Sequence, residues 1–286
     1  MQRETDWIGL WRELVETGDR GWQKLVSDGG PDVWATKARD FHERTVRRWQ
    51  TPDSSRALLA ATLRANPGCT ALDVGAGTGA WAAFLARHAR AVTAVEPSSG
   101  MIEVMRGHLA AEGVTNVTIV QGAWPDVSVE PHDFTLCSHA MYGHPDLPGF
   151  LRRLIGCTRR VCFLVMRAPT ADGLMAEAAR RVWGHPHDSP NFQVAYNVLL
   201  KMGICANVLM EDSGLWEPWT SPSLEEALAE LKRRLDLGDR REHDAFLADL
   251  VRRRLTEAEG GYRWPPGVRS ALVYWDVNRE REQGAP

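Results

Sequence analysis

Lysine supplies only four of the 34 basic residues in this 286-residue sequence, so arginine carries nearly all of the positive charge. With 37 acidic residues the formal net charge is -3, and the chain lacks the basic excess typical of nucleic-acid-binding proteins. It also lacks any stretch near the ~18 apolar residues that a membrane helix requires. Neither a nucleic acid nor a membrane is therefore an expected partner.

Cysteine pairs are missing too. The five cysteines include no CxxC pair and no zinc-type spacing, and their number is odd. The opening residues MQRETDW mix both charge signs and precede no apolar signal region. We therefore expect a reducing, cytoplasmic location and no metal site.

Tryptophan, in contrast, is abundant, with 12 residues against four tyrosines. Five of them fall in the first 49 positions: Trp7, Trp11, Trp22, Trp34 and Trp49. Apolar residues at helical spacing predict helices over 7–14, 34–49 and 54–63. We take residues 1–66 as an N-terminal helical cap segment.

From residue 67 the pattern changes to short apolar runs that alternate with helical stretches, as in βαβ units. Five strands are predicted at 70–74, 91–95, 117–121, 133–138 and 160–166. We expect residues 67–167 to form the core of a doubly wound α/β fold and residues 168–203 to form a cap insertion. Residues 204–286 would complete the core with strands at 204–211 and 268–277 and two inserted helices.

A glycine-rich turn follows the first strand, in the string Asp73-Val74-Gly75-Ala76-Gly77-Thr78-Gly79. With the next residue, Ala80, it also fits the dinucleotide pattern G-x-G-x-x-A, so an NAD-dependent oxidoreductase is one interpretation. A pyrophosphate, however, needs the helix N-terminus free of negative charge, and the Asp73 carboxylate would repel it. A cationic ligand such as S-adenosylmethionine (SAM) suits that position better. Glu96 ends the second strand, where a carboxylate can accept hydrogen bonds from both ribose hydroxyls.

These residues, with the Glu96-Pro97-Ser98 strand end and Met101 in the next helix, resemble class I SAM-dependent methyltransferases of the small-molecule type (type 11/12-like). The resemblance implies a Rossmann-like, seven-stranded, mainly parallel sheet whose last strand is antiparallel, covered by a helical cap. It also implies a set of SAM-binding residues in this chain: Asp73, Gly75, Ala76, Gly77, Gly79, Glu96, Pro97 and Met101. The segment 34–41 resembles the helix that closes over the cofactor in such enzymes.

After the third strand the sequence departs from the family pattern. The family often has Gly-Asp there, whereas this chain has Gly122-Ala123-Trp124. We therefore expect the adenine to be held by backbone groups of Ala123 and Trp124, with the indole stacked on the ring.

The fourth strand ends in Ser138-His139-Ala140-Met141-Tyr142, at the edge of the sheet where open α/β folds bind ligands. Ser138 is a predicted cofactor contact. His139 and Tyr142 are the candidate catalytic residues, with His139 as a general base, although a hydrogen-bonded residue lining the pocket is the alternative. Neither the Asn/Asp-Pro-Pro-Tyr/Trp motif nor the Pro-Cys motif of base methylation is present.

The function predicted from these features is methyl transfer from SAM to a small, hydrophobic or aromatic molecule, with S-adenosylhomocysteine (SAH) as the second product. The predicted acceptor contacts are Trp34, His139, Tyr142 and Trp183. RNA or protein methylation by the same core, and SAM binding without catalysis, are the other interpretations besides the oxidoreductase. The protein would act as a monomer or homodimer.

Overall fold

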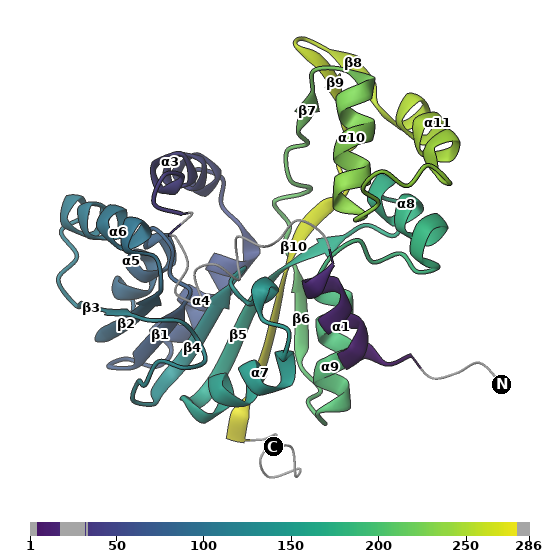
Figure 1. The fold of residues 1–286 in the computed structure, drawn as a ribbon. Coiled ribbons are helices and arrows are strands. Elements are labelled where there is room, and N and C mark those ends of the chain that lie inside the picture. The colour runs from purple at the N-terminus through teal and green to yellow at the C-terminus, as the bar shows by residue number, and fades with distance from the viewer. Residues whose placement is uncertain (1–4, 18–31, 33, 279–286) are drawn as a thin grey trace.

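A seven-stranded sheet forms the centre of the computed structural model, which describes residues 5–17, 32 and 34–278 (Figure 1). Trp22 and most of the 18–33 segment lie outside the described residues. The strands run in the spatial order β3-β2-β1-β4-β5-β10-β6. Their bounds are β1 Thr70–Val74, β2 Ala91–Glu96, β3 Val117–Gln121, β4 His132–Ser138, β5 Thr158–Pro169, β6 Asn207–Met210 and β10 Val268–Asp276.

The first five strands pair in parallel, whereas β10 pairs antiparallel with both β5 and β6. This arrangement confirms the predicted Rossmann-like α/β fold with an antiparallel last strand. β1 lies between β2 and β4, so the chain crosses over from one half of the sheet to the other beside β1. Ligands of open α/β sheets bind at that crossover, outside the carboxyl ends of the strands.

Alternate residues of each strand face two separate hydrophobic layers, as the twofold periodicity of a strand requires. In β5, Leu164 and Met166 join one layer, while Phe163 and Val165 join the other. Both faces are buried, which explains why these strands read as continuous apolar runs in the sequence.

Helices cover both faces of the sheet (Figure 1). One face carries α4 Ser54–Arg64, α5 Ala80–Ala86 and α6 Ser99–Ala111, and the other carries α1 Trp7–Glu16, α7 Leu147–Gly156 and α9 Phe192–Lys201. Side-chain caps begin most of these helices: Asp53 caps α4, Ser98 caps α6, Asp146 caps α7 and Asn191 caps α9. The N-terminal helix α1 is anchored by Trp11, which is fully buried and donates its indole N–H to the His144 carbonyl at 2.9 Å.

A separate lobe stands over one side of the sheet's carboxyl edge (Figure 1). It consists of α8 Leu174–Trp183, α10 Leu224–Arg234, α11 Asp244–Arg254 and a small antiparallel sheet of β7 Thr220–Ser221, β9 Gly261–Arg263 and β8 Thr256–Ala258. Its own hydrophobic cluster is built around Leu231, Leu247 and the buried Trp264. The two helices were expected from the sequence, but the small sheet was not, because strands of two or three residues carry no readable periodicity.

Opposite the lobe, helix α3 Ala38–Trp49 stands over the other side of the same edge (Figure 1). The space above the strand ends is thus bounded by α3 and by the lobe. No helix within the described residues is long and apolar enough to cross a membrane.

Candidate functional site

The glycine-rich turn connects the end of β1 to the start of α5. Gly75, Gly77 and Gly79 have φ values of 71°, 55° and 84°, in the left-handed region that favours glycine. The backbone N–H groups of Gly75 and Ala76 both donate to the Val95 carbonyl at 2.9 Å, which ties the turn to β2. The three glycines therefore shape a tight loop at the crossover of the sheet.

Two buried carboxyl groups lie directly beneath this loop. Asp73 is 1% exposed, and burial together with the nearby Glu96 raises its pKa to about 7. Its Oδ2 atom is buried and has no hydrogen-bond partner among the described residues. Such an atom is costly in a folded protein, and a bound hydrogen-bond donor would satisfy it.

Glu96 lies at the end of β2 and accepts hydrogen bonds from the backbone of Gly77 at 2.8 Å and of Ser98 at 2.9 Å. Burial raises the pKa of this carboxyl as well. Because a carboxylate has about four acceptor positions, two remain for a ligand. The glycine loop and its acidic neighbour are thus held together by the protein itself.

The segment preceding α3 packs against this region. Asp32 accepts hydrogen bonds from Ser98 Oγ at 2.8 Å and from the Gly100 N–H at 3.1 Å, joining the segment to the start of α6. A side chain at Gly100 would meet Ala35, and one at Gly77 would lie 3.7 Å from Phe41. Residues 34–41 therefore lie across the glycine loop, the position that the family resemblance implies for a covering helix.

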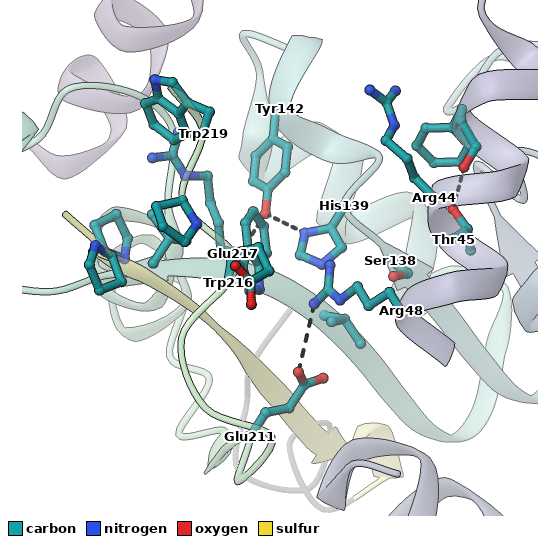
Figure 2. Close-up of a pocket in the computed structure, with 18 of the residues that line it drawn as sticks. Arg44, Thr45, Arg48, Ser138, His139, Tyr142, Glu211, Trp216, Glu217 and Trp219 are labelled. Carbon is teal, nitrogen blue, oxygen red and sulfur yellow. Dashed lines mark hydrogen bonds and ion pairs between the residues drawn. The ribbon is translucent and has the colours of Figure 1, made fainter. Parts of the chain in front are cut away.

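A cavity of about 730 Å³ opens from the glycine loop into the space between α3 and the lobe. Its aromatic wall comprises Phe41, Trp49, Trp81, Trp216, Trp219 and Trp264. Its polar lining includes Arg44, Arg48, Ser138, His139 and Tyr142, which Figure 2 labels. Arg167 also lines the cavity. The volume lies in the range of small-molecule sites, which are largely apolar with a few placed polar groups.

His139 and Tyr142 form one hydrogen-bonded unit at the carboxyl end of β4 (Figure 2). Tyr142 Oη lies 3.0 Å from His139 Nδ1 and accepts the backbone N–H of Arg167 at 2.6 Å. The tyrosine hydroxyl makes no other hydrogen bond to an acceptor among the described residues, so we assign its hydrogen to Nδ1. On this assignment the neutral imidazole carries its proton on Nε2. His139 also has φ 56°, a strained value for a non-glycine residue that is typical of functional sites.

The protonation of His139 is a testable consequence of this geometry. Burial, followed by the positive charges of Arg48 and Arg167, lowers its pKa to about 3. We expect the imidazole to stay neutral from pH 8 down to pH 5, with the proton on Nε2, as measured by ¹⁵N NMR of the histidine ring. A Tyr142→Phe variant should lose the fixed tautomer, whereas titration of wild-type His139 near pH 6.5 would contradict this assignment.

Some of the site residues predicted from the sequence line the cavity, and others do not. Gly75, Ala76, Gly77, Ser138, His139 and Tyr142 line it. Asp73, Gly79, Glu96, Pro97 and Met101 surround the glycine loop without lining the cavity, and Met101 is buried in the first turn of α6.

Four other residues that the sequence analysis assigned to the cofactor or the acceptor do not line the cavity: Trp34, Ala123, Trp124 and Trp183. Trp34 packs edge-on against Phe41 behind the cavity wall. Trp124, next to Ala123, contacts Phe150 and the Arg153 guanidinium. Trp183 lies beside His185, between the lobe and the sheet layer.

Sequence reasoning overlooked several residues that line the cavity. Arg167 lies near the end of β5, two residues after the partner of Ser138 at the end of β4, so its position after an apolar run could have indicated it. Trp216 and Trp219 lie in a loop before β7 and carry no local signal. Arg48 stands outside the apolar pattern of residues 34–49, yet it lines the cavity from α3.

Comparison with known proteins agrees with this geometry. Residues 71–160 match the family model described as a methyltransferase domain. A curated relative, an uncharacterised protein of Haemophilus influenzae, is 24% identical over 259 residues, which cover 87% of this chain and 90% of that protein.

Two solved structures share the fold. The YcgJ protein of Bacillus subtilis aligns over 77% of this chain and 96% of its own, with 18% identity and a TM-score of 0.51. A candidate methyltransferase of Bacillus halodurans aligns over 78% and 99%, with 14% identity and a TM-score of 0.50. The methyltransferase family model therefore supports the resemblance that the Gly75–Gly79 loop indicated, and the two structures share the Rossmann-like fold.

Proposed function

We propose that this chain, whose core is a class I methyltransferase domain, transfers the methyl group of SAM to a small, hydrophobic or aromatic acceptor and releases SAH. The observation that carries the proposal is the aromatic cavity of about 730 Å³ that opens directly from the glycine loop. A cofactor on the loop would face this cavity, and an acceptor of modest size would fill the remainder. A small-molecule acceptor also agrees with the chain's lack of net positive charge.

The residues beneath the loop fit SAM. The partnerless Oδ2 of Asp73 is suited to accept a hydrogen bond from the ammonium group of SAM, directly or through a water molecule. Glu96 has free acceptor positions for ribose hydroxyls at the position where Rossmann-like folds place an acid. A pyrophosphate in place of the methionine part would meet the Asp73 carboxylate, so the cavity favours SAM over NAD.

When bound, SAM supplies an activated methyl group on a sulfonium. The chain's task is then to align the acceptor with that methyl and to exclude water. The aromatic wall provides an apolar surface that excludes water. In this wall Trp49 and Trp81 pack edge to face, with their ring centres 4.9 Å apart. His139, neutral and hydrogen-bonded through Nδ1, is arranged to donate from Nε2, so we assign it to positioning the acceptor and no longer to general base catalysis.

The proposal is tested by titrating the purified protein with SAM, SAH and NAD in a calorimeter. We expect SAM and SAH to bind at micromolar concentration and NAD not to bind. Methyl transfer is then sought with SAM labelled in its methyl group and a set of aromatic small molecules. Binding of NAD in preference to SAM would overturn the proposal, and SAM binding with no transfer to any acceptor would favour a non-catalytic SAM-binding protein.

A further inference from the structure

Two arginine side chains flank His139 in the cavity. Both line the same cavity as this imidazole. Arg48 reaches this point from α3, and Figure 2 shows it beside His139. Arg167 reaches it from near the end of β5, and its backbone N–H donates to the Tyr142 Oη that lies 3.0 Å from His139 Nδ1. Two guanidinium groups therefore meet at this end of the cavity, beside an aromatic wall.

The Arg48 guanidinium is positioned by three neighbours, one of which is the ion-paired Glu211 (Figure 2). It lies 4.7 Å from the centre of the Trp216 ring, and its Nη2 donates to Ser270 Oγ at 2.8 Å. Ser270 Oγ also accepts the Trp216 indole N–H at 3.2 Å, so arginine and tryptophan are fixed together. The carboxylate of Glu211 is 3.9 Å from Nη2, beyond hydrogen-bond distance.

Arg167 has a buried donor with no partner. Its Nε–H makes no hydrogen bond with any described residue although the atom is inaccessible to bulk solvent. Nη1 donates to Ser189 Oγ, and Nη2 is 3.6 Å from the buried Asp188 carboxylate. An unpaired donor of a buried guanidinium is unfavourable, and an acceptor atom of a bound ligand would satisfy it.

We infer that the acceptor is an aromatic or apolar organic acid, whose carboxylate is held by Arg48, Arg167 and the Nε2–H of His139. Carboxylate oxygens are acceptors only and match guanidinium donors in geometry. Trp216 and Trp49 would then contact the apolar body of the acid. The inference rests on the proposed function and narrows its substrate class.

The charges around the two arginines also set the charge of the ligand. Asp188 lies 3.6 Å from Arg167 Nη2 and Glu211 lies 3.9 Å from Arg48 Nη2, so the two carboxylates balance the formal charge of the two arginines. A ligand with one negative charge meets less repulsion from these carboxylates than the two charges of a phosphate monoester would. A carboxylate is therefore favoured over a phosphate.

The experiment compares matched pairs of ligands on the full-length protein saturated with SAH. The probes are benzoate, cinnamate and 4-phenylbutyrate, each with its primary amide, and binding is followed by calorimetry and by the ¹⁵N shift of His139 Nε2. We expect at least one acid to bind about 10-fold or more tightly than its amide. The ratio of the two affinities should fall to near one in Arg48→Gln, whose side chain is half-exposed, and in Arg167→Met.

Arg181→Gln is the matched control, because Arg181 also lies over an aromatic ring, Phe246, but does not line the cavity. It should leave the preference for the acid unchanged. No acid preferred over its amide, or a preference that survives in both Arg48→Gln and Arg167→Met, would overturn the inference. Titration without SAH separates the two proposals, because the acid preference can persist in a protein that fails to bind SAM.

Discussion

Replacing Asp73 by asparagine is expected to weaken SAM binding about 100-fold, the largest effect that one polar substitution should have on this site. The side chain keeps its shape but loses its charge, and its buried Oδ2 position would present an N–H group to the ammonium group of SAM. A charged hydrogen bond lost in a buried site costs ~2–3 kcal/mol, which corresponds to this factor. Calorimetric Kd values for SAM and SAH at pH 8 measure the effect.

The pH dependence of SAM binding is an independent test of whether the ionised Asp73 carboxylate binds the cofactor. Since the pKa of Asp73 in the free protein is about 7, the group is mostly neutral at pH 6 and ionised at pH 8. SAM binding needs the ionised form, so its affinity should fall as the pH drops below 7, by up to about 10-fold per unit. Asp73→Asn should remove most of this dependence.

Asp146→Asn is the matched control for the charge change. Asp146 caps α7 outside the cavity, and asparagine is an equally good cap. SAM affinity in this variant should equal that of the wild type. Equal affinity in Asp73→Asn, or an affinity independent of pH between 6 and 8 in the wild type, would refute the assignment of Asp73 to the ammonium group.

Replacing Gly75 by alanine is expected to abolish measurable SAM binding. The new Cβ would lie 2.2 Å from the Ala140 Cβ, which is far too close for two carbon atoms that are not bonded to each other. Either the glycine loop or the start of the Met141–Gly143 turn must move, and both carry residues of the site. The residue also has φ 71°, which adds ~1–2 kcal/mol of strain for any side chain.

A Gly113→Ala variant separates the effect of backbone strain at a positive φ from the effect of the steric clash at Gly75. Gly113 has a similar φ of 66°, but a Cβ there meets no atom within 4 Å. We expect it to lose ~1 kcal/mol of stability in thermal unfolding while SAM affinity is unchanged. Gly75→Ala should be less stable than Gly113→Ala and should not bind SAM. Normal SAM binding by a folded Gly75→Ala protein would show that the cofactor does not use this loop.

The local sequence pattern was sufficient to predict the core strands of the sheet and the glycine-rich loop. Each core strand is buried on both faces and therefore appears as an apolar run, as in residues 160–166. The glycines at 75, 77 and 79 and the acids at 73 and 96 occupy strand ends, whose shared edge follows from parallel pairing alone. Fold class, crossover position and the methyltransferase resemblance could thus be read from the sequence.

The cavity wall could not be read in this way, because it is assembled from segments far apart in the chain. Trp264 reaches the cavity from the lobe, Trp216 from the loop before β7, Arg48 from α3 and Arg167 from β5. Trp34 and Trp183, which sequence reasoning placed at the acceptor, lie behind or beside the wall.

By itself the sequence determined which elements form the core and which strand ends carry the glycine loop and its acids, since these depend on short-range periodicity and on parallel pairing. The tertiary structure alone decided that Tyr142 is hydrogen-bonded to His139 and that Arg48 and Arg167 line the cavity with this imidazole. These contacts depend on how α3, the lobe and the sheet pack together. The same packing decided which tryptophans of this lysine-poor, tryptophan-rich chain line the cavity, because no spacing in the sequence records which distant side chains meet.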